Sequence, residues 1–184
     1  MQNKDSAHRA AESRAPVWIA CDDAGFESKR ELLALLEARG LPFVDCGGDD
    51  SPSRYPYYAA KVAAAVSSGR AERGILICGS GIGMSIAANK FPGVRAAVVG
   101  DVYGARLTRR HNDSNILCLG GKTLGPWQLA EIVRVWLDTP YDGGHHEGSL
   151  ALLRELERVT MSGALWDPES PPWPPFDWDP EQPL

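Results

Sequence analysis

The stretch Gly74-Ile75-Leu76-Ile77-Cys78-Gly79-Ser80-Gly81-Ile82-Gly83-Met84-Ser85 decides the fold prediction for this chain. An apolar run leads into a cysteine and then into closely spaced glycines, which is typical of a buried strand, a tight turn and a helix. The glycines predict backbone with positive φ, whose N–H groups point toward a ligand. A helix from Ile82 adds the positive end of its dipole, so the Cys78 thiol is expected to face an anion-stabilising loop. The competing interpretation of this stretch alone is a structural turn beside an inert, buried cysteine.

The composition indicates a globular protein of one domain. The chain has 184 residues and a net charge of −5, which disfavours nucleic acid and anionic membranes as partners. No apolar run approaches the roughly 20 residues that span a bilayer. Residues 1–15 lack the apolar region of a signal peptide, so we expect a cytoplasmic location. The four cysteines form no CxxC pair, and we expect free thiols and neither a disulfide nor a zinc site.

Strand-like and helix-like segments alternate along the chain. Strands are expected at residues 17–20, 41–46, 74–78, 94–99 and 115–119, and helices at 25–39, 57–68, 82–90, 102–110, 126–137 and 149–159. This order is typical of a parallel sheet covered on both faces. We therefore predict an α/β fold, a three-layer αβα sandwich with a five-stranded, parallel, Rossmann-like sheet.

The two ends of the chain differ from its middle. We predict a disordered N-terminal extension over residues 1–15, one folded domain over residues 16–160 and a Pro/Trp-rich tail over residues 161–184. The prolines of the tail prevent a regular helix. Its tryptophans favour an extended arm on a protein surface, and we expect residues 164–178 to pack across a dimer. The alternative is a disordered appendage.

Polar side chains stand where predicted elements end. Ligands of parallel sheets bind at the carboxyl ends of the strands, which directs attention to Asp22, Cys78 and His111. Each has a structural alternative, with Asp22 and Asp23 as helix caps and His111 as a solvated turn residue. A thiol, loop amides, an imidazole and a carboxylate at one edge together predict enolisation of a sugar. Acyl transfer by a Cys78–His111 dyad is the competing chemistry, but no residue supplies its orienting third group.

Four segments resemble the signatures of the ribose-5-phosphate isomerase B family, which includes the galactose-6-phosphate isomerase subunits. They are Asp22-Asp-Ala-Gly-Phe26, Gly74 to Lys90 with Pro92 to Ala96, Arg106-Leu-Thr-Arg-Arg-His-Asn-Asp113, and Tyr141-Asp-Gly-Gly-His-His146. The resemblance covers residues 17–157. It implies aldose–ketose isomerisation through a cis-enediol, without metal or cofactor. It also implies a homodimer, or a tetramer, whose active sites are shared between subunits.

The resemblance further implies residue roles. Cys78 resembles the base that forms the enediol, His111 the residue that opens the sugar ring, and Asp22 the carboxylate that assists ring opening. The remaining positions that resemble substrate-binding residues of the family are Asp23, Tyr55, Gly79, Ser80, Gly81, Gly83, Asn112, Lys122 and His145. No metal ligand is implied.

Several positions depart from the family pattern, chiefly where that pattern binds phosphate. Asp23 replaces a histidine, Lys122 an arginine, His145 and Ser149 two further arginines, and Arg54 an aspartate. A phosphate dianion is usually held by several cations. We therefore expect an isomerase for a sugar or sugar phosphate, such as a tetrulose phosphate, that is not optimised for ribose 5-phosphate. The alternative is a non-catalytic sugar-binding or subunit-type homologue that requires a partner chain.

Overall fold

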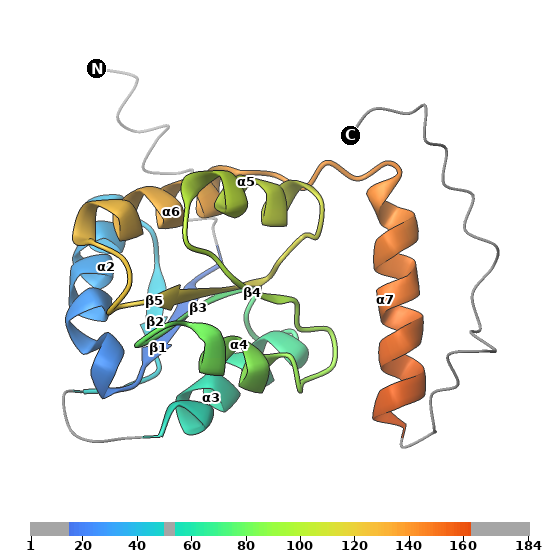
Figure 1. Ribbon diagram of the computed structural model, residues 1–184, viewed down its shortest axis with the longest axis horizontal. Helices are drawn as coiled ribbons and strands as arrows, with labels where there is room; N and C mark the ends of the chain where they lie inside the picture. Colours follow the sequence, from blue (N-terminus) through green and yellow to red (C-terminus); the bar gives the residue numbers. More distant parts are fainter. Residues whose placement is uncertain (1–14, 50–53, 163–184) are drawn as a thin grey trace. The chain divides into compact units, whose positions relative to one another are not determined.

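A parallel sheet forms the centre of the structure, a computed structural model that describes residues 15–49 and 54–162. The strand order within these residues is β2-β1-β3-β5-β4, and every pair is parallel (Figure 1). The strands are β1 (Val17–Cys21), β2 (Phe43–Asp45), β3 (Arg73–Cys78), β4 (Ala96–Val98) and β5 (Ile116–Gly120). The central strand β3 is buried from its second residue to its last, which explains its unbroken apolar run.

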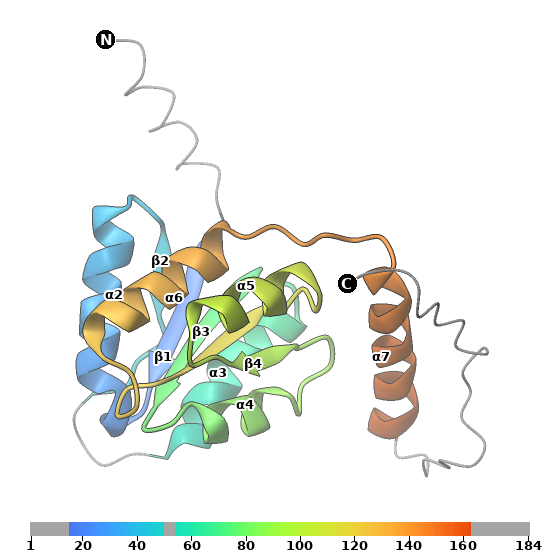
Figure 2. The same ribbon diagram turned by 45° about the horizontal axis from the view of Figure 1, so that its top comes forward.

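Helices cover both faces of the sheet (Figure 2). One face carries α2 (Phe26–Ala38), α5 (Val102–Arg110) and α6 (Pro126–Asp138). The other carries α3 (Tyr55–Ser67) and α4 (Ile82–Ala88). A short 3-10 turn, η1 (Asp23–Gly25), joins β1 to α2. The predicted αβα sandwich is confirmed.

Alternate residues of each strand enter two separate cores, because successive strand side chains point to opposite faces. Ile75 and Ile77 pack in the core beneath α2, α5 and α6, together with Trp136. Leu76 and Cys78 pack in the core beneath α3 and α4, together with Met84. The thiol that the sequence singled out therefore lies on the α3/α4 side of the sheet.

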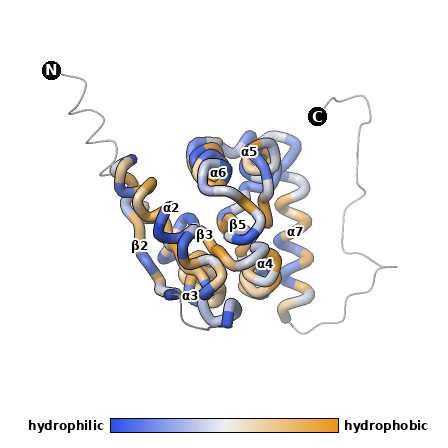
Figure 3. The backbone as a smooth tube through the Cα atoms, turned by 60° about the vertical axis from the view of Figure 1, so that its left-hand side comes forward, coloured by the Kyte–Doolittle hydropathy of each residue, from blue (hydrophilic) through white to orange (hydrophobic). Residues whose placement is uncertain are grey.

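The chain divides into two units, Met1–Gly143 and Gly144–Leu184. The first contains the whole sheet. The described part of the second consists mainly of α7 (His146–Met161), along which hydrophilic and hydrophobic residues alternate (Figure 3). Among the described residues, no helix is long and apolar enough to span a membrane. The domain limits at residues 15 and 160 stay predictions, and the predicted packing of residues 164–178 lies outside the described residues.

Element boundaries differ from the predicted ones by a few residues. Helix α3 begins at Tyr55, earlier than predicted, because Pro56 occupies its first turn, where a missing N–H is harmless. Helix α7 also begins earlier, at His146. Helix α4 ends at Ala88 and has only seven residues. The helix dipole behind the glycine loop is therefore shorter than the sequence suggested.

Candidate active site

The carboxyl ends of β1 and β3 form the switch point of the sheet. These strands are neighbours, with Cys21 level with Ile77. The chain leaves β1 toward α2 on one face and leaves β3 toward α4 on the other. Ligands of parallel sheets bind where the connections diverge in this way. Asp22 and Cys78 follow directly at this point, as the sequence predicted.

Cys78 ends β3, and the loop after it folds back onto its sulfur. The Gly81 N–H donates a hydrogen bond of 3.1 Å to Cys78 Sγ, and the residue is 5% exposed. The other buried thiols are poor bases at neutral pH. Burial raises the pKa of Cys21 to about 12 and also raises the pKa of Cys118. Cys78 stands at the end of β3 with an amide donor on its sulfur, a place and a partner that suit proton transfer.

Gly81 gives the loop its shape. It has a φ of 78°, a left-handed conformation that side chains with a Cβ rarely adopt. A Cβ at this position would also come within 3.0 Å of the Leu119 backbone. The expected positive φ at Gly79 and Gly83 is wrong, because Gly81 alone of the three adopts it. The loop needs one left-handed residue to turn its amide toward Cys78.

Gly83 is required for a different reason, the close approach of Tyr55. A Cβ at Gly83 would lie 2.9 Å from the Tyr55 ring, so the ring rests directly on the first turn of α4. Tyr55 begins α3 and is 38% exposed. The Tyr55 ring therefore covers Gly83 in the first turn of α4, and its predicted role in substrate binding stays a prediction.

Asp22 connects β1 to the site. Its backbone N–H donates to Ile77 O at 3.2 Å, and its carboxylate accepts from the Gly25 N–H at 3.2 Å. The carboxylate therefore caps the 3-10 turn, as the sequence allowed. Burial raises the pKa of Asp22, and the negative charge of Asp23 raises it further. A buried carboxyl group with this tendency to hold a proton suits acid–base chemistry.

Lys122 brings a cation to the same edge. The turn after β5 is fixed by hydrogen bonds from Gly121 N to Cys78 O, 2.8 Å, and from Lys122 N to Gly79 O, 3.0 Å. A Cβ at Gly79 would lie 3.7 Å from Lys122 Cδ, so the lysine chain runs beside the loop. Lys122 and Asp23 are both exposed. We call Asp22, Cys78, Gly81 and Lys122 the thiol half-site.

His111 and Asn112 lie at the opposite edge of the sheet. They follow α5 and precede β5, whereas Cys78 is level with Gly120, the last residue of β5. The strand β5 alone, from Ile116 to Gly120, is about 13 Å long, and this length separates the two edges. The prediction that the imidazole and the thiol of one chain meet at one edge is therefore wrong, because β5 runs parallel to β3 and is entered at its amino end. We call His111 and Asn112 the imidazole half-site.

Two arginines fix the turn that carries the imidazole half-site. Asp113 has a φ of 45° and accepts 2.8 Å hydrogen bonds from Arg95 and Arg109. Arg95 Nε also donates to the Asn112 carbonyl oxygen at 3.1 Å. Arg109 is 5% exposed and lies over the Trp136 ring. Arg95 and Arg109 thus hold the backbone of the turn.

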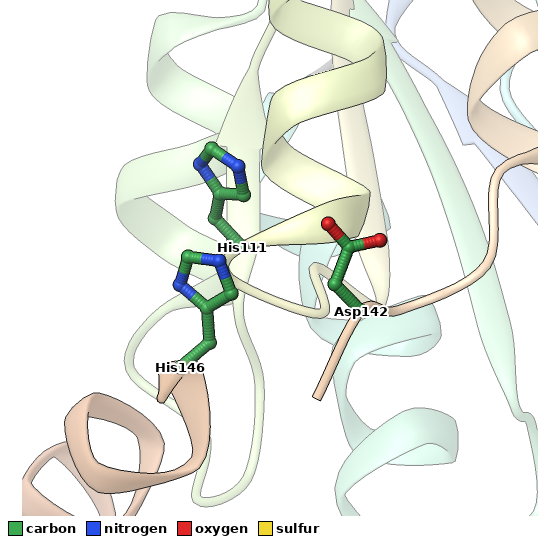
Figure 4. A group of neighbouring side chains, drawn as sticks. All are labelled: His111, Asp142 and His146. Atoms are coloured by element: carbon green, nitrogen blue, oxygen red, sulfur yellow. The ribbon is translucent and has the colours of Figure 1, made fainter. Parts of the chain in front are cut away.

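Asp142 is a neighbour of His111 that sequence reasoning did not select. One of its carboxylate oxygens and a His111 ring nitrogen lie within 4.8 Å of each other (Figure 4). Asp142 lies inside the quoted Tyr141–His146 signature, so the only signal was an acidic residue in a matching segment. A carboxylate beside an imidazole is an arrangement suited to acid–base chemistry.

His145 belongs to the second unit, where it precedes the first turn of α7. Its ring contacts that of His146 at a tilt of 40°, with centroids 3.9 Å apart. Within this unit the two imidazoles lie at the N-terminal end of α7. The predicted role of His145 in substrate binding stays a prediction.

Comparison with known proteins identifies the relatives of this chain. The family described as Ribose/Galactose Isomerase matches residues 17–153. The chain belongs to that family. Ribose-5-phosphate isomerase B of Escherichia coli is 44% identical over 143 residues, 77% of this chain and 96% of the relative. The D-erythrulose-4-phosphate isomerase of Pectobacterium atrosepticum is 38% identical over 130 residues, 70% of this chain and 86% of the relative.

Solved structures of the family share the fold. Ribose-5-phosphate isomerase B of Clostridium thermocellum superposes with a TM-score of 0.76 at 43% identity, covering 78% of this chain and 97% of the other. The enzyme of Mycoplasma genitalium, solved with bound ribulose 5-phosphate, gives a TM-score of 0.75 at 33% identity, covering 78% and 96%. The protein is an aldose–ketose isomerase. A thiol, a carboxyl group and a loop amide are groups suited to the acid–base steps of such a reaction.

Proposed function

We propose that the protein isomerises a sugar or sugar phosphate for which ribose 5-phosphate is not the best substrate. The observation that carries this proposal is an intact thiol half-site beside phosphate-binding positions that differ from the family pattern. The Cys78 sulfur accepts the Gly81 amide, and the Asp22 carboxylate accepts the Gly25 amide. Asp23 is exposed at the same edge, where the family pattern has a histidine. A carboxylate repels a phosphate dianion and accepts hydrogen bonds from sugar hydroxyls.

The proposed chemistry uses one base and no oxidant. Cys78, as thiolate, takes the proton from C2 of the open-chain aldose, and the electron pair forms the C1–C2 double bond of a cis-enediolate. The glycine loop stabilises the charge on oxygen through its amides. The hydroxyl proton moves from O2 to O1, and Cys78 returns its proton to C1 to give the ketose. Asp22 and His111 exchange protons with the ring oxygen and the anomeric hydroxyl to open a cyclic substrate.

We infer that the active site is shared between two copies of the chain. Because Cys78 and His111 lie at opposite edges of one sheet, a sugar bound at the thiol half-site needs a histidine from elsewhere. Exposed apolar side chains on α4, Ile82 and Ile86, provide a surface that a second copy would cover. Val98 on β4 and Tyr103 on α5 are also exposed. A homodimer meets this requirement, and a tetramer built from two such dimers would meet it equally.

The substrate class follows from the charges that remain. Lys122 beside Gly79 is one cation at the thiol half-site, and His145 and Ser149 replace two arginines of the family pattern. Fewer cations favour a substrate with less negative charge than ribose 5-phosphate. The relative named D-erythrulose-4-phosphate isomerase supports a four-carbon candidate.

A panel assay tests the proposal. Purified protein is incubated in D2O with tetroses, pentoses and hexoses, each free and phosphorylated, and deuterium uptake at C1 and C2 is followed by NMR. We expect uptake with at least one sugar, faster than with ribose 5-phosphate, and loss of uptake in Cys78→Ala. No uptake with any sugar would refute the isomerase. Uptake only after a second gene product is added would favour the subunit-type homologue.

A further inference from the structure

We propose that Asp142 is a positioning residue that orients the His111 imidazole for ring opening. The proposal rests on the proposed function, in which His111 exchanges a proton with the sugar ring. It assigns a role to a residue outside the thiol and imidazole half-sites defined above. Asp142 acts through His111 and does not touch the substrate.

Arg110 holds Asp142 in place from two directions. Its Nε and one of its terminal nitrogens each lie 2.8 Å from Asp142 Oδ2. The Asp142 backbone N–H in turn donates to the Arg110 carbonyl oxygen at 3.0 Å. The segment after α6 is thereby fixed to the last turn of α5, although 32 residues separate the two in sequence. Because Arg110 binds both the backbone and the side chain of Asp142, the Asp142 carboxylate has few positions available.

His111 is the residue directly after Arg110. Its backbone N–H donates to Leu107 O at 2.9 Å, which completes the end of α5. Its half-buried imidazole lies beside the Asp142 carboxylate, with a ring nitrogen and a carboxylate oxygen within 4.8 Å (Figure 4). The backbone that carries the imidazole and the carboxylate that faces it are therefore fixed by the same arginine.

A carboxylate at this place has a chemical consequence. Neutral imidazole has two tautomers, and only one presents its N–H and its lone pair in the directions that a given proton transfer requires. A neighbouring carboxylate favours the tautomer whose N–H points toward it and steadies the imidazolium that forms during transfer. Apo geometry is often looser than the reacting complex, so a separation below 4.8 Å can tighten when a sugar binds.

The competing explanation is that the Arg110–Asp142 ion pair only fastens a linker. Its two side chains are 46% and 32% exposed, and pairs with this exposure contribute little to stability. The pair between Arg39 and Asp138 is a matched control, because its side chains are 26% and 38% exposed and its closest contact is also 2.8 Å. Both pairs tie the end of α6 or the segment after it to another helix, but only one faces His111.

The experiment compares Asp142→Asn, Asp142→Glu, Asp138→Asn and His111→Ala in the full chain. The first readout is the NMR spectrum of 15N-histidine-labelled protein, in which nitrogen shifts report the tautomer of His111. We expect Asp142→Asn to change the His111 tautomer ratio and Asp138→Asn to leave it unchanged. Identical His111 nitrogen shifts in Asp142→Asn and the unmodified protein would overturn the proposal. This readout does not require activity.

The second readout separates ring opening from enolisation. Ribose 5-phosphate is a closed ring, whereas ribulose 5-phosphate, whose 5-hydroxyl is esterified, stays open. We expect Asp142→Asn to slow conversion of ribose 5-phosphate by about tenfold while deuterium uptake at C1 of ribulose 5-phosphate changes less than about twofold. Asp142→Glu, which keeps the carboxylate, should restore most of the rate.

The His111→Ala variant distinguishes a failure of the Asp142 inference from a failure of the proposed function. If His111→Ala slows only the closed sugar and Asp142→Asn does not, the inference about Asp142 is wrong. If His111→Ala slows both sugars equally or neither, the ring-opening role of His111 in the proposed function is wrong, and the tautomer measurement still decides whether Asp142 orients the ring.

Discussion

The Gly81 amide donates a 3.1 Å hydrogen bond to the Cys78 sulfur, across a turn that a left-handed Gly81 makes possible. This contact joins the end of β3 to the start of α4 and fixes the direction of the sulfur. Amide donors to sulfur strengthen as negative charge develops there. The predictions about the thiol half-site follow from this relationship.

Replacing Cys78 by alanine or serine should abolish isomerisation while the fold persists. The thiol is the proposed base, and removing a general base typically lowers the rate by about 100-fold to 10,000-fold. Steady-state kinetics and circular dichroism check both parts. Cys46→Ala is the control, because that thiol is only half-buried and lies outside the half-site. Equal activity losses in both variants would contradict the assignment.

Gly81→Ala should lower both stability and activity. Left-handed backbone costs a residue with a Cβ about 1–2 kcal/mol, and the new Cβ would also press on the Leu119 backbone at 3.0 Å. Gly69→Ala separates the two effects, since Gly69 has a φ of 74° and nothing within 4 Å of the Cβ position. Urea unfolding should show a larger loss for Gly81→Ala, and only that variant should lose activity.

Asp22→Asn should remove a pH-dependent cost to stability. Because burial and Asp23 raise the pKa of Asp22 above its value of 3.8 in the unfolded chain, the folded state binds its proton more tightly. Stability is therefore highest below that value and falls as pH rises through the higher pKa of the folded state. Asparagine can still cap Gly25 but does not ionise. Urea unfolding should show the variant gaining stability relative to the unmodified protein as pH rises from 3.8 toward neutral.

The control for this prediction is Asp23→Asn, which removes the neighbouring charge and should weaken the pH effect without abolishing it. Parallel stability curves for Asp22→Asn and the unmodified protein over this pH range would show that Asp22 is not the group responsible. Activity should fall in Asp22→Asn, so stability and catalysis would change in opposite directions.

Lys29→Met should destabilise the fold strongly. The Lys29 side chain is 4% exposed, and its ammonium binds Asp45 at 2.9 Å and the carbonyl oxygens of Gly47 and Gly48. Removing it leaves these acceptors without their donor, which we expect to cost about 2–4 kcal/mol given that Asp45 is partly exposed. Arg30→Met, which breaks an exposed pair with Glu27, should change the free energy of unfolding little. Equal effects in the two variants would contradict the buried-pair account.

Mixing two inactive variants should restore activity if the site is shared. A dimer of one Cys78→Ala chain and one His111→Ala chain has one site with both residues and one with neither. Random reassortment of equal amounts should then give about a quarter of the activity of the unmodified protein. Each variant is assayed alone and after mixing under dissociating conditions and dilution. No recovery, with mixed dimers demonstrated by mass spectrometry, would show that each chain uses its own His111.

Local features of the site could be predicted from the sequence because neighbours in the chain cause them. The apolar run before Cys78 predicts a buried strand, and Asp22 caps the turn that directly follows it. Gly81 adopts its left-handed conformation in the tight turn between the end of β3 and the start of α4. Each of these outcomes depends on residues within about one helical turn of each other.

Contacts between distant segments were decided only by the tertiary structure. The position of β5 between β3 and β4, and its direction, places His111 at the amino edge and Lys122 at the carboxyl edge beside Gly79. Asp142 reaches His111 because Arg110 binds it across the fold.

The sequence by itself therefore determined the α/β architecture, the thiol loop and the family signatures, because hydrophobic spacing and turn residues act locally. The tertiary structure decided which of the predicted residues share an edge. That outcome depends on strand order and strand direction, which arise from burying both faces of one sheet at once and which no single segment specifies. The separation of Cys78 from His111 within one chain is the consequence that matters most for function, because it makes a second copy part of the proposed active site.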